Sequence, residues 1–139
     1  MIEVKIVEDK KGFFDAVRIR EKVFIEEQGY TNEFDEFDYK SLHAVGYINN
    51  QPIATARIII KDQVGKIGRV AVLKEHRKKG YGKEICHKLL AVAKEMKIKS
   101  FTLSAQIDKT NFYESLGFRK IGNPYLEDGT EHIEMVMNI

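Results

Sequence analysis

The fold is decided by one stretch of the sequence, which reads Ile67-Gly68-Arg69-Val70-Ala71-Val72 and, a short segment later, Arg77-Lys78-Lys79-Gly80-Tyr81-Gly82-Lys83. The first part is apolar and rich in β-branched residues, which is typical of a buried strand. The second part is a basic loop with two glycines. Apolar residues then repeat at helical spacing, at Ile85, Leu89, Val92, Ala93 and Met96. The stretch therefore predicts a strand, a glycine loop and a helix in direct succession.

The glycine loop is a candidate phosphate site. The first N–H groups of a helix have no partner inside the helix and, with the helix dipole, they attract anions. Gly80 and Gly82 would let the backbone approach a phosphate closely. Positive charge would come from Arg77, Lys78, Lys79 and Lys83. A P-loop needs Ser or Thr where Glu84 stands, and a dinucleotide fingerprint needs glycine where Ile85 stands. The pattern leaves two readings: a different phosphate site, or a tight turn with solvated lysines.

Outward from this stretch, alternation and helical periodicity predict the other elements. We expect further strands at residues 2–6, 42–48, 53–60, 101–105, 118–121 and 132–137. Asp9 is the candidate cap of a helix from Lys11 towards Glu27, and a short helix over residues 111–116 should end at Gly117. The buried face of the first helix is expected at Phe13, Val17, Arg20 and Phe24. Residues 30–40 show no clear period and should form a loop or a short helix.

The connections between these strands define the sheet. Turn residues at Asn49-Asn50-Gln51-Pro52 and Asp128-Gly129 predict two hairpins. The strand–helix–strand unit over residues 66–105 should place its two strands side by side and parallel. We therefore expect an α/β fold with a mixed, mostly antiparallel, twisted sheet of about six or seven strands and helices on both faces.

Composition limits the class of protein. The chain has 139 residues, 43% of them hydrophobic, so we expect one domain over residues 1–139. The net charge of +2 argues against a nucleic-acid partner, and no run approaches the roughly 20 apolar residues that span a membrane. We expect a cytoplasmic protein with no membrane partner. The single cysteine, Cys86, is expected to pack in the core, and the histidines lack ligand spacing, so no metal site is expected.

The glycine loop resembles a known signature. Arg77-Lys78-Lys79-Gly80-Tyr81-Gly82 is similar to the Arg/Gln-x-x-Gly-x-Gly/Ala motif of the GCN5-related N-acetyltransferases (GNAT), which binds the pyrophosphate of coenzyme A (CoA) through backbone amides. Asn111-Phe112-Tyr113, with the following Leu116-Gly117-Phe118, resembles the second CoA-contacting motif of that family. The resemblance implies CoA contacts at Val70, Ala71, Val72, Arg77, Lys78, Lys79, Gly80, Tyr81, Gly82, Lys83, Asn111, Phe112 and Tyr113. From the residues alone, Asn111 is equally well explained as a helix cap.

The first half of the chain narrows the resemblance. Residues 20–28, the acidic stretch up to Asp38, and His43 resemble a small single-domain bacterial subgroup, called ElaA-like or YjcF-like. The resemblance implies the GNAT fold and an N-acetyltransferase that uses acetyl-CoA, with a primary amine of a small molecule or peptide attacking directly in a ternary complex. A homodimer is possible for this family. The alternatives are an acyltransferase that uses another acyl-CoA, or a non-catalytic CoA-binding regulatory module.

Acetyl transfer needs a neutral amine, donors for the oxyanion and a proton for the departing thiolate. Tyr113 is the predicted proton donor, because a phenol is protonated at neutral pH; the other explanation is a packing aromatic. The family places a backbone N–H of Val70 or Val72 at the oxyanion, which requires a bulge in that strand. We predict His43 and Glu27 as catalytic residues for deprotonation of the amine. The remaining candidates for the base are Asp38 and His132.

Six carboxylates lie close together in the first half of the chain, at Glu26, Glu27, Glu33, Asp35, Glu36 and Asp38. Such a cluster beside the acceptor would attract a small cationic amine, such as a polyamine or an amino sugar. The alternative explanation is an ordinary solvated acidic face.

Overall fold

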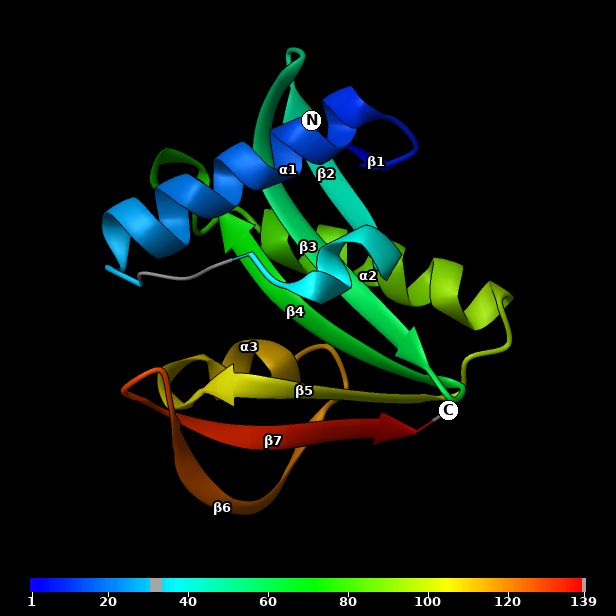
Figure 1. The fold of residues 1–139 in the computed structure, drawn as a ribbon, viewed down its shortest axis with the longest axis vertical. Helices are drawn as coiled ribbons and strands as arrows, with labels where there is room; N and C mark the ends of the chain where they lie inside the picture. The colour runs from blue at the N-terminus through cyan, green and yellow to red at the C-terminus, as the bar shows by residue number, and fades with distance from the viewer. Residues whose placement is uncertain (31–33, 139) are drawn as a thin grey trace.

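The computed structural model describes residues 1–30 and 34–138. Seven strands form one sheet in the order β1-β2-β3-β4-β5-β7-β6 (Figure 1). Their bounds are β1 (Glu3–Ile6), β2 (Leu42–Ile48), β3 (Gln51–Lys61), β4 (Val64–Val72), β5 (Ser100–Gln106), β6 (Arg119–Glu127) and β7 (Thr130–Asn138). All neighbouring strands pair antiparallel except β4 and β5, which pair parallel. The expected mixed, mostly antiparallel sheet is confirmed.

Helical segments cover both faces of this sheet. They are α1 (Lys10–Arg20), the π-helix η1 (Glu21–Glu27), the 3₁₀ helices η2 (Glu36–Lys40), η3 (Lys74–His76) and η4 (Ile107–Lys109), α2 (Tyr81–Glu95) and α3 (Thr110–Glu114). Figure 1 shows α1 and η2 in front of the sheet and α2 behind it. Within the described parts of the chain, no helix is long and apolar enough to cross a membrane.

Each face of the sheet has its own apolar core. The larger core lies under α2, where Ile85, Cys86, Leu89 and Leu90 pack on inward residues such as Phe101. Burial raises the pKa of the Cys86 thiol to about 12, so Cys86 serves as a small packing residue. Met96, expected on the buried face, lies beyond the end of α2 and is half exposed.

The first helix differs from the expectation in two ways. Asp9 caps it as expected, since its carboxylate accepts the Gly12 N–H at 2.8 Å. Its buried face, however, is formed by Ala16, Ile19, Arg20 and Val23, whereas Phe13, Val17 and Phe24 are only partly buried. The small Ala16 allows the helix to lie close to the sheet, against Val45 and Ala71. After Arg20 the chain continues as the π-helix η1 instead of an α-helix.

The two predicted hairpin turns have the backbone conformations that their residue types favour. Asn49 and Asn50 both adopt positive φ, at 50° and 65°, as a two-residue turn requires, so Gln51 and Pro52 already belong to β3. Asp128 and Gly129 likewise have φ of 52° and 76° between β6 and β7. The predicted hairpins are therefore present, and the first turn is shorter than expected.

Strands β4 and β5 separate towards their C-terminal ends. Their pairing covers Val64 with Ser100, Gly65 with Phe101, and Lys66 with Thr102, and then stops (Figure 1). Beyond these pairs β4 continues to Val72 and β5 to Gln106. We call this divergence, between residues 67–72 and 103–106, the split.

A bulge in β4 lies beside the split. Arg57 pairs with Gly68 and Thr55 pairs with Ala71, so Arg69 and Val70 together oppose the single residue Ala56. Arg69 has a positive φ of 53°, which is unusual for a residue other than glycine and is typical of a bulge. The bulge that the oxyanion prediction required is therefore present.

Candidate functional site

The N-terminus of α2 is open to an anion. Gly80 holds the cap position with φ of 82°, and no side chain caps the helix. The first helical bond runs from the Glu84 N–H to the Gly80 carbonyl at 3.1 Å, so the N–H groups of residues 81–83 precede the helical ladder. A Cβ atom placed on Gly80 would meet nothing within 4 Å. These residues fit a diphosphate, because bare backbone donors and open space coincide at a helix dipole.

Three predicted CoA-contacting elements meet at Gly82. A Cβ atom on this residue would lie 3.4 Å from the Phe112 ring and 3.5 Å from the Val72 side chain. The side chains of Phe112 in α3 and Val72 at the end of β4 therefore both lie beside the first turn of α2. Asn111 lies in the first turn of α3, where the cap position is Lys109 and no side-chain cap bond forms. Asn111 is thus not the helix cap.

The Arg77 side chain binds the end of β4 and the end of η1. Its Nε donates to the Val72 carbonyl at 2.8 Å, and its two Nη atoms donate to the Glu27 carboxylate at 2.6 Å each. These hydrogen bonds hold the pKa of Glu27 below its ordinary value. Glu27, predicted as a catalytic residue, is therefore engaged with Arg77 and is a weak base in this arrangement.

Backbone N–H groups of β4 face the split. The Leu73 N–H donates to the Ile53 carbonyl at 2.9 Å, which directs it towards β3. Successive N–H groups of an extended strand point to opposite edges, so the Val72 N–H points towards the split. The Val72 carbonyl, on the same edge, accepts from Arg77. The bulge removes Val70 from the regular ladder as well.

Tyr113 lies on α3 among aromatic neighbours. Its ring centroid is 5.0 Å from that of Phe112 and 6.4 Å from that of Phe118, both edge-to-face. Burial raises the pKa of the Tyr113 hydroxyl well above its ordinary value, so the phenol is protonated at neutral pH. The side chain packs against the core under α2. It can therefore donate a proton on the α2 side of the sheet.

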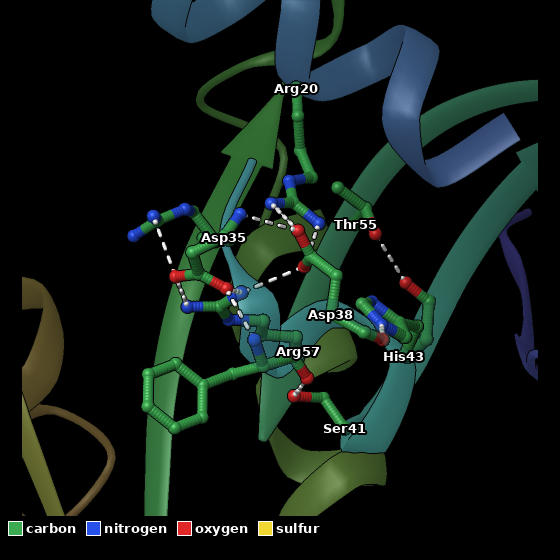
Figure 2. Close-up of polar contacts among 10 residues, drawn as sticks. Arg20, Asp35, Asp38, Ser41, His43, Thr55 and Arg57 are labelled. Carbon is green, nitrogen blue, oxygen red and sulfur yellow. Dashed lines mark hydrogen bonds and ion pairs between the residues drawn. The ribbon is translucent and has the colours of Figure 1, made fainter. Parts of the chain in front are cut away.

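A buried ion-pair cluster occupies the opposite face (Figure 2). Its members are Arg20, Asp35, Asp38, Arg57 and Arg69. Arg20 donates to both Asp38 oxygens, at 2.8 and 3.2 Å. Arg57 donates to Asp38 and to both Asp35 oxygens, each at 2.7 Å, and Arg69 reaches Asp35 at 3.2 Å. The cluster fastens η2 to α1 and to strands β3 and β4.

The charges of this cluster are fixed by their partners. Burial alone would raise the pKa of Asp38, but hydrogen bonds from Arg20, from the Asp35 N–H and from Arg57 lower it to about 2. Hydrogen bonds from Arg57 likewise hold the pKa of Asp35 below its usual range. Asp38, a candidate base, is 4% exposed and remains a carboxylate bound to two arginines.

His43, the second predicted catalytic residue, lies beside this cluster on β2. Its Nε2–H donates to the Asp38 carbonyl at 2.8 Å (Figure 2). The Phe13 ring packs edge-to-face against the imidazole, with 5.2 Å between the ring centroids. Burial lowers the pKa of His43. His43 shares the α1 face of the sheet with its strand neighbour Val45, whereas Tyr113 packs on the α2 face. The structure therefore does not bring His43 and Tyr113 together.

The acidic stretch does not form one open face. Glu27, Asp35 and Asp38 are each paired with arginine. Glu26 and Glu36 are exposed. Glu33 lies outside the described residues. The charge available to attract a cationic amine from this stretch is therefore smaller than the sequence indicates.

A second polar cluster lies on strands β5, β7 and β6, on the face away from Phe101, Leu103 and Ala105. Its members are Ser104, Gln106, Tyr125, Glu127 and His132. The Ser104 hydroxyl contacts the Tyr125 hydroxyl and also donates to Glu127 at 3.3 Å. Sequence reasoning named only His132 among these residues. The available signal was the alternation of Ser104 and Gln106 with the apolar residues of β5.

The end of η1 and the residues that follow it bridge the open end of the split. Gln106 Nε2 donates to Gln28 Oε1 and to the Tyr30 hydroxyl, both at 3.2 Å. The Tyr30 hydroxyl in turn donates to Thr130 Oγ1 at 3.3 Å. Glu27 binds Arg77, and Arg77 in turn donates to the carbonyl of Val72, the last residue of β4. Residues 27–30 therefore bridge β4 to β5 and β7. Among the residues that the structure describes, no three His, Cys, Asp or Glu side chains gather as a metal site would require.

Comparison with known proteins agrees with this geometry. The family model of the acetyltransferase (GNAT) domain matches residues 11–139, so the chain belongs to the GNAT acetyltransferase family. Membership supports an acyl-CoA-dependent N-acyltransferase activity.

Individual relatives extend over nearly the whole chain. The uncharacterized N-acetyltransferase YjcF of Bacillus subtilis is 34% identical over 94% of this chain and 96% of its own length. The crystal structure of Escherichia coli ElaA matches with a TM-score of 0.90 and 30% identity, covering 99% of this chain and 100% of that one. The expected resemblance to the ElaA-like and YjcF-like subgroup is confirmed. A GNAT acetyltransferase from Elizabethkingia anophelis, solved with acetyl-CoA bound, shares the fold, with a TM-score of 0.78 and 16% identity over 99% of this chain and 98% of that one.

Proposed function

We propose that this protein transfers the acetyl group of acetyl-CoA to a primary amine, as one GNAT domain over residues 1–139. The observation that carries the proposal is the uncapped N-terminus of α2 at Gly80, in contact through Gly82 with Phe112 of α3 and Val72 of β4. Support for acetyl-CoA in particular comes from the related fold solved with that molecule bound.

The chain offers a distinct contact for each part of the cosubstrate. The diphosphate would accept hydrogen bonds from the backbone of residues 80–83, with Lys78, Lys79 and Lys83 adding positive charge. The pantetheine arm would pair with the free edge of β4 in the split, where the ladder to β5 has ended. Arg77 contributes indirectly, because it holds the Val72 carbonyl and the η1 end in place.

The chemical step then uses groups on both sides of the split. A neutral amine attacks the thioester carbonyl carbon, and negative charge develops on the carbonyl oxygen. The N–H of Val72, or that of Val70 at the bulge, would stabilise this charge. As the C–S bond breaks, the Tyr113 hydroxyl donates a proton to the thiolate. Acetyl-CoA and an amine are the partners that this reaction requires.

The proposal is tested by calorimetric titration with CoA and acetyl-CoA, followed by thiol-release assays across an amine panel. In the double variant Lys78→Glu/Lys79→Glu, the affinity for CoA should fall about a hundred- to thousandfold, since each lysine–phosphate pair at about 4 Å contributes about 1 kcal/mol in water and charge reversal replaces this attraction with a repulsion of about the same size. The matched control, Lys88→Glu/Lys99→Glu, reverses two exposed charges away from the loop and should bind like the parent.

Two results would contradict the proposal. An absence of heat with both CoA and acetyl-CoA would remove the cosubstrate site. Binding of acetyl-CoA without thiol release for any amine would leave a non-catalytic CoA-binding module. Faster thiol release from a longer acyl-CoA than from acetyl-CoA would instead identify a different acyl donor and leave the proposed CoA site unchanged.

A further inference from the structure

We propose that His132 is the catalytic residue that removes the proton from the acceptor amine, that the Thr130 carbonyl positions its ring, and that Glu127 stabilises its charged form. This inference rests on the proposed acetyl transfer and adds to it the acceptor side of the reaction.

The geometry of the His132 ring suits a base. Its Nδ1 lies 2.8 Å from the Thr130 carbonyl, and a carbonyl can only accept, so Nδ1 carries a proton. In the neutral ring Nε2 therefore has the free lone pair. Glu127 Oε2 lies 3.6 Å from Nε2, so the imidazolium formed by proton uptake would meet a carboxylate. This is the arrangement of a base oriented by one group and stabilised by another.

The position of His132 suits the acceptor side of the split. His132 pairs across the ladder with Gln106, the last residue of β5, and with Tyr125 of β6, whose ring stacks on it at 6.4 Å. Gln106 contacts Gln28 and Tyr30, and the neighbouring Glu27 binds Arg77 at the end of β4. A continuous series of contacts thus leads from the C-terminal end of β4, around the open end of the split, to His132. An amine that enters the split from the α1 face would meet these residues, His132 among them.

The other candidate bases are engaged in ways that weaken them. Glu27 is held by both Nη atoms of Arg77. Asp38 is buried between Arg20 and Arg57. His43 donates its Nε2 proton to a carbonyl, and its remaining ring nitrogen, Nδ1, is buried with no carboxylate or other hydrogen-bond partner among the described residues. His132 alone among these four pairs a free ring nitrogen with a nearby carboxylate.

The proton and electron changes balance as follows. The ammonium group gives one proton to His132 Nε2, directly or through one water, and its freed lone pair forms the N–C bond to the thioester carbonyl. The C–S bond breaks, and the thiolate takes the Tyr113 hydroxyl proton. The second proton on the attacking nitrogen passes to solvent as the amide forms, Tyr113 regains a proton from solvent, and His132 releases its proton.

The titratable groups around His132 come from several elements. Glu127 and Tyr125 face it from β6, and Tyr30 approaches from the η1 end through Thr130. Its own strand carries Glu131 and Glu134, and Glu134 accepts a hydrogen bond from Thr102 of β5 at 3.2 Å. The facing element β5 contributes the neutral side chains Ser104 and Gln106.

The test compares three variants with an amine that the parent accepts. His132→Asn keeps a donor for the Thr130 carbonyl and loses the distal nitrogen. We expect kcat to fall about 10²- to 10⁴-fold, with the affinity for acetyl-CoA unchanged. Glu127→Gln should lower kcat by a smaller factor, about tenfold. Glu134→Gln, which removes a charge from the same strand, serves as the control and should stay within about twofold of the parent.

The pH profile separates catalysis from structure. As the pH rises towards the pKa of the amine, solvent deprotonates more of the substrate. The ratio of the parent's kcat to that of His132→Asn should therefore shrink by up to about tenfold per pH unit. Activity within twofold of the parent at neutral pH would overturn the inference. A deficit that stays constant up to high pH would also overturn it, because a merely structural role gives that result. If the parent itself acetylates no amine, the proposed function fails and the inference fails with it.

Discussion

Replacing Asp38 with asparagine should destabilise the fold strongly and in a pH-dependent way. Asp38 is 4% exposed and binds Arg20 and Arg57, so Asp38→Asn leaves two buried guanidinium groups short of one negative charge. Breaking a buried ion pair from one side costs about 3–5 kcal/mol in the free energy of unfolding. This loss is large compared with the total stability of about 5–15 kcal/mol of an ordinary domain.

The pH dependence follows from the pKa of the carboxyl group. The pKa falls from 3.8 to about 2 on folding, because the arginine hydrogen bonds outweigh the effect of burial. A lowered pKa gives stability that is fully present above pH 4 and is lost as the pH falls towards 2. At about 1.4 kcal/mol per unit, the ionised carboxylate accounts for about 2 kcal/mol of this pH-dependent stability.

Urea unfolding of the parent and of Asp38→Asn between pH 7 and pH 2 measures both effects. The difference in the free energy of unfolding between the parent and Asp38→Asn should narrow by about 2 kcal/mol as the pH falls from 4 to 2. The double variant Arg20→Met/Asp38→Leu removes one arginine together with the aspartate and should be more stable than Asp38→Asn. A gap below about 1 kcal/mol, or a gap that does not change with pH, would refute the assignment of Asp38 as a buried carboxylate that stabilises the fold.

Two further predictions concern the split. Tyr113→Phe should lower turnover about 10²-fold and leave the affinity for acetyl-CoA unchanged, as measured by thiol release and calorimetry; unchanged turnover would remove Tyr113 as the proton donor. Gly65→Ala should destabilise the protein by about 1–3 kcal/mol in urea unfolding, because its Cβ would lie 2.7 Å from Ile58 and 2.9 Å from the Phe101 ring at the closed end of the split. Gly68→Ala, whose Cβ would meet nothing within 4 Å, is the matched control, and equal losses in both variants would contradict the packing argument.

The sheet and the α2 loop could be predicted because their signals are local. Apolar alternation marks β5 at Phe101, Leu103 and Ala105, and each of these residues is buried. The glycines before α2 stand where a helix must begin with bare N–H groups, and Gly80 has the left-handed φ that its residue type allows. The pairings of β2 with β3 and of β6 with β7 followed from the hairpin turns, and the parallel pairing of β4 with β5 followed from the strand–helix–strand connection. The place of β7 between β5 and β6 was not predicted.

The ion-pair cluster on the α1 face could not be predicted, because it depends on contacts between residues that are distant in the sequence. Arg20 looked like one more position on a helix face, yet its partner Asp38 lies in another element. Arg57 interrupts an otherwise apolar strand, which indicates a buried acidic partner without saying which one. The bulge at Arg69 gave no local signal either, since the residue with positive φ is an arginine.

In the proposed complex, an acyl-CoA bound in the split would become part of the sheet. Strands β4 and β5 hold each other through three residue pairs at one end, and the side chains of residues 27–30 bridge them at the other. A pantetheine arm lying between them would supply the backbone partners that the two strands cease to offer each other, and so would close the ladder. Supply of acyl-CoA would then govern how much of this protein resists proteases, because a ligand that binds only the native form shifts the folding equilibrium towards it. Starvation for CoA would lower the abundance of the protein before any change in its synthesis.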